Sequence, residues 1–170
     1  MTAEKSKLTL VNFNKENLLE GRHILIVESP DSRRAVSLNT SVFSIGRHPN
    51  NALVVSDKLI SRHHATIAWM KYTGKSGQTD YSYWIIDGKG KRQRSRNGVF
   101  IDGQKKTLHR LDSGDIISLG KGIKITYNFI TYSSETSGFL NYCDTQKQQY
   151  SSKSDSNYME TIIKDFSSNE

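Results

Sequence analysis

The chain has 170 residues and a hydrophobic content of 35%, enough for one domain with an extension but not for two full domains. Its longest apolar stretch, His23–Val27, is far too short to span a membrane, and the polar N-terminus lacks the apolar region of a secretion signal. The single cysteine, Cys143, has no partner for an internal disulfide, so we expect a cytoplasmic protein without a membrane segment.

The net charge of +7 is unevenly distributed along the chain. Residues 133–170 hold three lysines and six acidic residues, a balance of −3, so residues 1–132 carry +10. A basic domain with an acidic tail favours an anionic partner. Nucleic acid, an acidic peptide and a phosphopeptide all satisfy that condition, and charge alone does not choose among them.

Short apolar runs separated by turn signals recur through the first 132 residues. Residues 1–21 are polar, with one strand-like stretch at Thr9–Phe13. The runs that follow have the composition of strands: His23–Glu28, Arg34–Leu38, Val42–Ile45, Ala52–Val55, Ala65–Tyr72, Tyr83–Asp87, Val99–Ile101, Lys105–Leu108, Ile116–Leu119 and Ile123–Tyr127. Short strands at a spacing of about 8–12 residues predict an all-β sandwich, here with about ten to eleven strands. Ile67 and Trp69 lie on one face of their strand, Asp102–Gly103 is the type I′ hairpin pair that closes Val99–Ile101, and Pro49–Asn51 is turn-prone.

Residues 133–170 differ in composition from the rest. Ser, Thr, Asn, Gln and charged residues dominate, and such a segment buries too little apolar surface to offset its ordering entropy. We therefore expect a largely disordered C-terminal tail after a domain at residues 22–132 and an N-terminal arm at residues 1–21. The apolar residues of Tyr158–Phe166 fit a short amphipathic helix, and both a docked helix and a partner-binding motif stay open for this segment.

Three short signatures stand at the ends of predicted strands. Each signature alone is typical of an ordinary turn, but the order and spacing of the three signatures indicate a pocket, built from loops, for a phosphorylated side chain. Arg47 follows a glycine that allows unusual backbone dihedrals, and its guanidinium binds phosphate through paired donors. Ser61 adds a hydroxyl donor and Arg62 a second cation. The signatures are Gly46–Arg47, Ser61–His64, and Asn97–Gly98 followed by Phe100–Gly103.

In this order the signatures resemble the forkhead-associated (FHA) domain, a β-sandwich that binds phosphothreonine peptides. The family pattern reads approximately G-R, S-R-x-H, N-G before a strand, and a late L-x-x-G-D-x-I-x-L-G. The matching segments are Gly46–Arg47, Ser61–Ala65, Ser95–Gly103 and Leu111–Gly120, and the resemblance covers about residues 22–130. It implies a non-catalytic interaction module that binds a Thr-phosphorylated protein or peptide and needs no cofactor.

The resemblance also implies a role for each matching residue. Arg47 and Ser61 would contact the phosphate, Arg62 would add a further contact, and Asn97 would hold the peptide backbone beside the phosphothreonine. Three further residues would be structural at the site: Gly46 and Gly98 would shape the loops, and His64 would brace them.

The chain departs from the family pattern beside this site. Arg96 stands where the family usually has Thr or Ser, and Val99 where it usually has Thr. The segment Lys89–Arg96 is longer and more basic than the usual link. We expect Arg96 to add a cation over the ligand, so these departures bear on ligand selectivity and not on the fold.

The basic segment is also the best argument for nucleic acid, because its cations could contact phosphate backbones. Two other interpretations stay open: a solvated loop, and a loop that favours acidic residues flanking the phosphothreonine. We rank nucleic acid below a phosphopeptide, and a salt titration on duplex DNA separates the two. A metal site is not expected, since His63 and His64 are adjacent and point to opposite faces of a strand. Nor is an enzyme expected, since the chain has no nucleophile-elbow, P-loop or metalloprotease motif. Asp112 and Asp115 look like a carboxylate pair, but the resemblance implies that they are turn formers. The tail offers Thr136, Thr145 and Thr161 as phosphorylation sites that could occupy the chain's own pocket.

Overall fold

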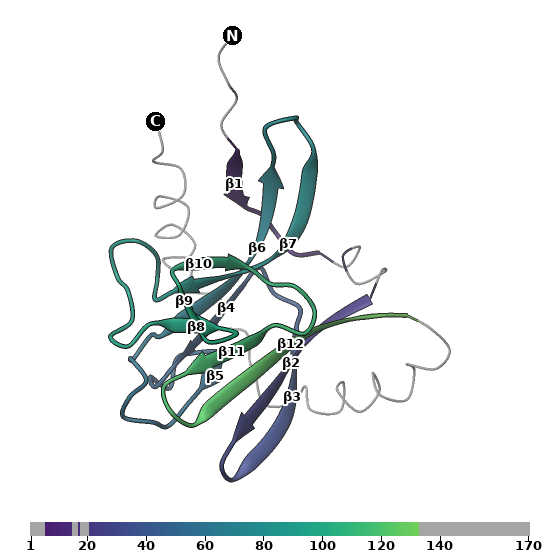
Figure 1. The fold of residues 1–170 in the computed structure, drawn as a ribbon. Coiled ribbons are helices and arrows are strands. Elements are labelled where there is room, and N and C mark those ends of the chain that lie inside the picture. Colours follow the sequence, from purple (N-terminus) through teal and green to yellow (C-terminus); the bar gives the residue numbers. More distant parts are fainter. Residues whose placement is uncertain (1–5, 15–16, 18–20, 133–170) are drawn as a thin grey trace.

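A computed structural model describes residues 6–14, 17 and 21–132. They form two six-stranded sheets packed face to face, which confirms the predicted all-β sandwich (Figure 1). The described residues contain twelve strands, slightly more than predicted. Residues 133–170 lie outside the described residues. The predictions that concern the disorder of the tail, the segment Tyr158–Phe166 and the three tail threonines therefore fall outside the described part of the chain. No helix in the described part of the chain is long and apolar enough to cross a membrane.

One sheet is built around the central strand β6 and is called the β6 sheet. Its order is β10-β7-β6-β4-β5, and β1 also pairs with β6. All of its pairs are antiparallel except the short parallel pair of β4 with β5, which the sequence did not predict. The strands are β1 (Lys7–Leu10), β4 (Val42–Gly46), β5 (Leu53–Val54), β6 (Ala65–Thr73), β7 (Thr79–Asp87) and β10 (Leu108–Arg110).

The other sheet is called the β2 sheet, and its order is β3-β2-β12-β11-β8-β9. Every pair in it is antiparallel. The pair of β2 with β12 brings the start and the end of the domain together, with Gly21 opposite Thr131. The strands are β2 (Gly21–Ser29), β3 (Ser32–Leu38), β8 (Val99–Ile101), β9 (Gln104–Lys106), β11 (Ile116–Leu119) and β12 (Ile123–Thr131).

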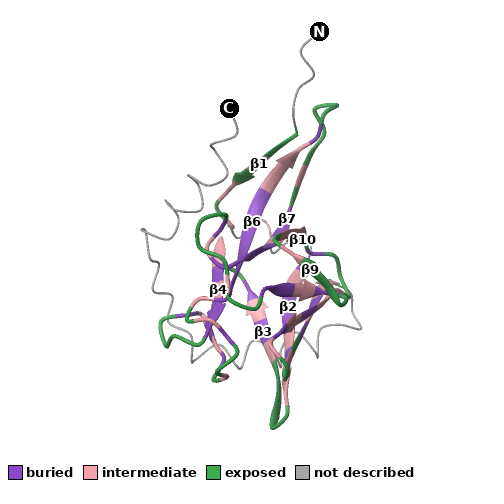
Figure 2. Ribbon diagram, turned by 60° about the vertical axis from the view of Figure 1, so that its left-hand side comes forward, coloured by how far each residue is buried: buried purple, intermediate pink, exposed green. Residues whose placement is uncertain are grey.

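The core lies between the two sheets because side chains alternate between the faces of each strand. Ile67 and Trp69 of β6 point inward and pack with Leu25 and Ile125 of the β2 sheet. The first six residues of β6 are all buried, including those that point away from this core (Figure 2). The prediction that Ile67 and Trp69 lie on one face of their strand is therefore confirmed, and that face lies in the core.

The predicted return strand Lys105–Leu108 is wrong as a single element. Asp102 and Gly103 both have positive φ, 47° and 79°, which is the predicted type I′ turn between β8 and β9. After β9 the chain leaves the β2 sheet at Thr107, and β10 pairs with β7 in the β6 sheet. Apolar alternation alone does not reveal which sheet a three-residue strand joins.

The N-terminal stretch Thr9–Phe13 is integrated into the sandwich. The strand β1 covers Lys7–Leu10 and extends the β6 sheet, and Val11 N–H donates to the Trp69 carbonyl over 3.1 Å. The Phe13 ring stacks on Tyr83 at a centroid distance of 5.6 Å and meets Trp69 edge-on at 5.1 Å. The residues just before β2 thus close one part of the core.

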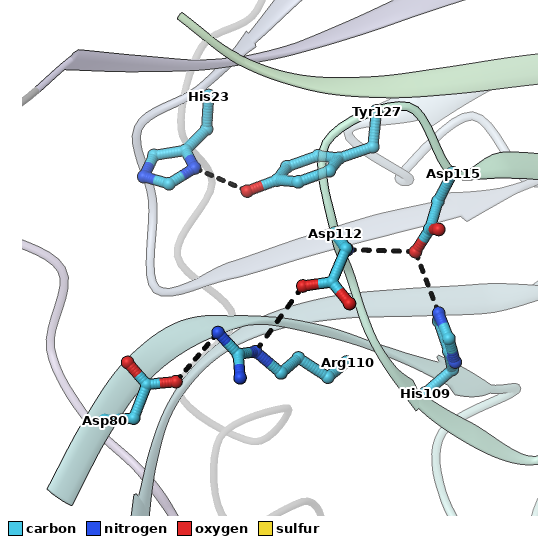
Figure 3. A network of polar contacts seen from close by, with 7 residues as sticks. All are labelled: His23, Asp80, His109, Arg110, Asp112, Asp115 and Tyr127. Atoms are coloured by element: carbon cyan, nitrogen blue, oxygen red, sulfur yellow. Dashed lines mark hydrogen bonds and ion pairs between the residues drawn. The ribbon is translucent and has the colours of Figure 1, made fainter. Parts of the chain in front are cut away.

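Asp112 and Asp115 form a turn before β11 (Figure 3). Asp115 Oδ2 accepts hydrogen bonds from the Asp112 backbone N–H at 2.9 Å and from His109 Nε2 at 2.8 Å. Gly114 within this turn has φ of 102°. The carboxylate of Asp115 is therefore engaged in holding the turn that connects β10 to β11, as expected for turn formers.

His23 gives the sandwich a pH-dependent stability. Its side chain is buried in the core, and its Nδ1 lies 2.6 Å from the Tyr127 hydroxyl. Burial lowers the His23 pKa from 6.5 to about 4, so the folded protein keeps the ring neutral. Below pH 6.5 the unfolded chain takes up a proton that the folded chain does not, so this stability is complete above pH 6.5 and is lost as the pH falls toward 4. We expect His23 to cost roughly 2 kcal/mol of unfolding free energy between pH 7.5 and pH 5.

Urea unfolding at pH 7.5, 6 and 5 checks this expectation. Burial also lowers the pKa of His63 and His64, so the wild-type loss includes their contribution. The comparison is therefore between wild type and His23→Gln, which should lose less stability over the same pH interval. An equal loss in both proteins would contradict the assignment to His23.

Candidate functional site

Three loops that are far apart in sequence meet at one end of the sandwich. Arg47 directly follows β4, and its backbone N–H donates to the Ser61 carbonyl over 2.9 Å. The next residue, His48, donates in the same way to the Arg62 carbonyl over 3.0 Å. The first two sequence signatures therefore lie side by side, joined by their backbones.

Gly46 is required here by close packing of backbones. A Cβ on Gly46 would lie 2.5 Å from the Arg62 carbonyl oxygen and 2.9 Å from the Cα atom of His63. Gly98 has a positive φ of 86°, whereas Gly46 is not among the described glycines with positive φ. The sequence predicted that glycine is needed at position 46 for unusual backbone dihedrals, and this prediction is wrong. Glycine is needed there because the first two loops contact each other closely.

Asn51 also joins these two loops, and the sequence reasoning did not assign it to the site. Its buried Nδ2 donates to the His48 carbonyl at 2.8 Å and to the Arg62 carbonyl at 2.7 Å. In the sequence this residue looked like part of a turn after Pro49. Only the tertiary contact between two loops distinguishes a bridging asparagine from a turn asparagine, so no sequence signal was available.

His64 connects the second loop to the third. Its ring is fully buried; Nδ1 accepts a hydrogen bond from Ser61 N–H at 3.1 Å, and Nε2 donates to the Gly98 carbonyl at 2.9 Å. These two partners define the neutral Nε2–H tautomer. Burial lowers the pKa of His64, more than the nearby Gly98 carbonyl and Asp87 raise it, which keeps that tautomer uncharged.

His63 contacts a different partner. Its Nε2 lies 3.0 Å from Thr66 Oγ1, whose hydroxyl donates to the Gly88 carbonyl over 2.7 Å. Burial, followed by the charges of Lys89 and His64, lowers the His63 pKa to about 3. Both histidines are therefore neutral at physiological pH, and positive charge at the loops must come from arginine and lysine.

The buried carboxylate of Asp87 holds the third loop, which contains Ser95 and Asn97, in place. Asp87 Oδ1 accepts hydrogen bonds from the Ser95 backbone at 3.1 Å and from the Ser95 hydroxyl. The Ser95 hydroxyl oxygen in turn accepts from Gly98 N–H at 2.9 Å. This chain of contacts fixes the course of residues 95–98, and with them the position of Asn97.

Ser61 joins the second and third loops through its side chain. Its Oγ accepts a hydrogen bond from Arg96 N–H at 2.9 Å. A hydroxyl keeps one donor when its oxygen accepts, so Ser61 can still donate its proton to an anionic ligand. Asn97 makes a parallel link, since its Nδ2 donates to the Leu59 carbonyl at 2.7 Å and its Oδ1 remains an acceptor.

The arginines project from this framework. Arg47, Arg62, Arg96 and Asn97 are exposed, and Ser61 is half-buried. Arg47 Nε donates to the Ile60 carbonyl at 3.2 Å, which orients the guanidinium, and no hydrogen bond to another described residue engages its two terminal amino groups. All five predicted site residues therefore lie on loops that contact one another.

Lys105 is a further cation beside these loops that sequence reasoning missed. Its Nζ lies 2.9 Å and its Cε 2.2 Å from where a Cβ on Gly98 would stand, so the lysine side chain lies across the Asn97–Gly98 turn. The type I′ hairpin places it there, because Lys105 of β9 pairs with Phe100 of β8. The predicted hairpin was the available signal, although it did not identify which lysine faces the turn.

The two-sheet sandwich thus carries cations, a hydroxyl and an amide on three loops that contact one another. The profile described as FHA domain matches residues 43–120, which include all the loops described above. The chain belongs to the FHA domain family.

Solved structures of other proteins resemble this chain. Slr1951 of Synechocystis sp. is a solved structure with a TM-score of 0.52 and 33% identity, over 62% of this chain and 96% of that one. The yeast Dun1 FHA domain, solved in complex with a doubly phosphorylated peptide derived from Rad53, has a TM-score of 0.50 and 25% identity, over 69% and 80% of the two chains. FHA domains related to this chain thus bind phosphothreonine peptides, and the family is typically a non-catalytic binding module.

A curated relative extends far beyond the matching part. The uncharacterized protein sll1895 of Synechocystis sp. is 41% identical over 106 residues, which are 62% of this chain but 15% of that protein. A second curated relative is matched over 65% of its length. The chain therefore spans less than two thirds of either curated relative.

Proposed function

We propose that this protein is a non-catalytic signalling adaptor whose domain, at residues 22–132, binds Thr-phosphorylated partner proteins through the three loops. The observation that carries the proposal is the hydrogen-bonded framework in which His64 joins the Ser61 loop to the Gly98 loop. Such a framework holds donors in place before the ligand arrives, which lowers the ordering cost of binding.

Each exposed residue has a proposed role. Arg47 and Ser61 bind the phosphate, the first through its terminal amino groups and the second through its hydroxyl proton. Arg62 adds a further cation, and Asn97 binds the peptide backbone with its remaining amide groups. Each charge-assisted hydrogen bond contributes about 1.5–3 kcal/mol, so three of them approach the ~8 kcal/mol of a micromolar complex.

Selectivity around the phosphothreonine is proposed to come from Arg96 and the basic loop before it. Arg96 is exposed next to Ser61, and Lys105 lies across the neighbouring turn. Together they place positive charge beside the proposed phosphate position, which favours acidic residues flanking the phosphothreonine.

Phosphorylation dependence is the direct test. We expect phosphothreonine peptides with acidic flanks, selected from a library, to bind with micromolar affinity and their unphosphorylated forms to bind at least about 100-fold more weakly, since two or more charge-assisted contacts are lost. Isothermal titration at two salt concentrations provides the measurement. Equal affinity for both forms would refute the proposal, and tight binding of duplex DNA at moderate salt would favour nucleic acid in its place.

The chain's own tail is a further candidate ligand. Thr136, Thr145 and Thr161 lie outside the described residues, and binding of a phosphorylated tail to the pocket of the same or a neighbouring molecule stays a prediction. Kinase treatment should then lower the affinity for an added phosphopeptide or raise the mass in solution. An unchanged affinity and mass would exclude tail binding.

A further inference from the structure

Asn97 and Gly98 of the third loop form the single Asn-Gly step in the sequence. Such a step is prone to spontaneous deamidation, because glycine has no side chain to keep its backbone nitrogen away from the amide of the preceding asparagine. Asn97 is exposed, and Gly98 has a positive φ of 86°, a conformation that glycine adopts readily. The residue proposed to bind the peptide backbone therefore belongs to a chemically reactive step of the chain.

Deamidation at this step needs only water as a co-reactant. The backbone nitrogen of Gly98 loses its proton and bonds to Cγ of Asn97, while the Cγ–Nδ2 bond breaks and the amino group leaves with that proton as ammonia. The product is a cyclic succinimide. Water then adds to one of the ring carbonyl carbons and breaks the bond from that carbon to the Gly98 nitrogen, which regains a proton. Asn97 is thereby converted to aspartate or isoaspartate without an oxidant or a reductant.

The attacking nitrogen is engaged by Ser95 in the structure. Gly98 N–H donates to Ser95 Oγ at 2.9 Å, and the Ser95 hydroxyl donates its own proton to the buried carboxylate of Asp87. The Ser95 oxygen therefore presents only lone pairs to Gly98. A Gly98 nitrogen without its proton would lose this hydrogen bond and face those lone pairs, which raises the free energy of the first step.

Two further hydrogen bonds fix the groups on either side of this nitrogen. Asn97 Nδ2 donates to the Leu59 carbonyl at 2.7 Å, which holds the amide group against the second loop. His64 Nε2 donates to the Gly98 carbonyl at 2.9 Å, which fixes the peptide group that follows Gly98. Rotation of the Asn97 amide toward the Gly98 nitrogen breaks the bond to Leu59, and rotation of that nitrogen toward Cγ breaks its bond to Ser95. The reaction therefore requires the loop to open first.

We propose that Asn97–Gly98 is a site of spontaneous deamidation and that the Ser95 hydroxyl holds this reaction in check. Ser95 then has a protecting role in addition to its role in the loop framework. The product carboxylate has no hydrogen to donate to the Leu59 carbonyl, and isoaspartate also lengthens the backbone by a methylene group. Either product adds a negative charge to loops proposed to bind an anion, so the expected loss of phosphopeptide binding on deamidation rests on the proposed function.

Ageing of the full chain at mildly alkaline pH tests the proposal. Wild type, Ser95→Ala and a synthetic peptide of residues 92–105 are incubated together, and cleavage after lysine releases the same peptide from each protein. The mass increase from amide to acid in that peptide gives the rate. We expect wild type to deamidate at least about 30-fold more slowly than the free peptide, because the bonds to Ser95 and Leu59 must open first. Ser95→Ala should react about 10-fold faster than wild type, because Gly98 N–H loses its acceptor and the loop loses a link to Asp87.

Ser95→Thr and Ser41→Ala are the matched controls, and both should react at the wild-type rate. Threonine keeps a hydroxyl at position 95, and Ser41 is another half-buried serine whose Oγ accepts a backbone N–H, from Phe13 at 2.8 Å. Ser95→Cys, whose thiol is a weak acceptor, replaces Ser95→Ala in the comparison if circular dichroism shows the alanine variant to be unfolded.

Three results would each overturn the protecting role of Ser95. They are a wild-type rate equal to that of the free peptide, an unchanged rate in a folded Ser95 variant without the hydroxyl, and an equal acceleration in Ser41→Ala. The rate measurement uses no phosphopeptide, so its outcome is separate from that of the proposed function.

Discussion

Arg47→Ala is expected to reduce the affinity for a phosphothreonine peptide at least about 100-fold while leaving the sandwich folded. Two charge-assisted hydrogen bonds from the terminal amino groups, at about 1.5–3 kcal/mol each, correspond to 3–6 kcal/mol, and each 1.4 kcal/mol is tenfold in affinity. The side chain is exposed, and its only hydrogen bond recorded among the described residues is the one from Nε to the Ile60 carbonyl. Removal of the Arg47 side chain should therefore lower the unfolding free energy only slightly.

The matched control is Lys75→Ala, which removes the same charge at the other end of the sheet. Lys75 lies in the turn between β6 and β7, and β6 runs about 30 Å away from the loops over its nine residues. Titration calorimetry of both variants, with thermal unfolding as the check on folding, should show near wild-type affinity for Lys75→Ala only. Retained phosphopeptide binding by a folded Arg47→Ala protein would remove Arg47 from the site.

The resemblance indicated the proposed site residues, but it did not supply the contacts that hold their loops together. Gly46, Ser61 and Gly98 were identified from local motifs, because turns and strand ends have recognisable sequences. The bridging role of Asn51 depends on a contact with Arg62 eleven residues away, and that of Asp87 on a contact with Ser95. Such contacts follow from the meeting of loops in space, which no periodicity in the sequence encodes.

The fold shows the same division between local and long-range information. Strand alternation correctly identified Ile67 and Trp69 as one face of β6, since that pattern is a property of a single strand. It could not divide Lys105–Leu108 between two sheets, because the partners of β9 and β10 are set by sheet assembly. Strand alternation also did not show that Ala68 and Met70, on the other face of β6, form a buried cluster separate from the core. Apolar residues on both faces of a strand are equally typical of a fully buried strand.

His64→Ala is expected to lower the unfolding free energy by about 4 kcal/mol, the largest effect on stability among the changes considered. The substitution leaves a cavity where a fully buried ring was, and it removes the partners of Ser61 N–H and the Gly98 carbonyl. An orphaned buried polar group costs about 1–3 kcal/mol, and a cavity of this size adds to that cost. A domain with a typical stability of 5–15 kcal/mol would remain mostly folded at low temperature.

The same change should weaken phosphopeptide binding by the folded molecules, because His64 joins the Ser61 loop to the loop of Asn97 and Gly98 without touching the ligand itself. His48→Ala is the control, since His48 is an exposed histidine whose ring accepts one local hydrogen bond from Asn50 N–H at 3.2 Å. Urea unfolding should place His48→Ala within about 0.5 kcal/mol of wild type. A loss of less than 1 kcal/mol in His64→Ala, or peptide affinity equal to wild type at a temperature where it is folded, would mean that the three loops hold their positions without this ring.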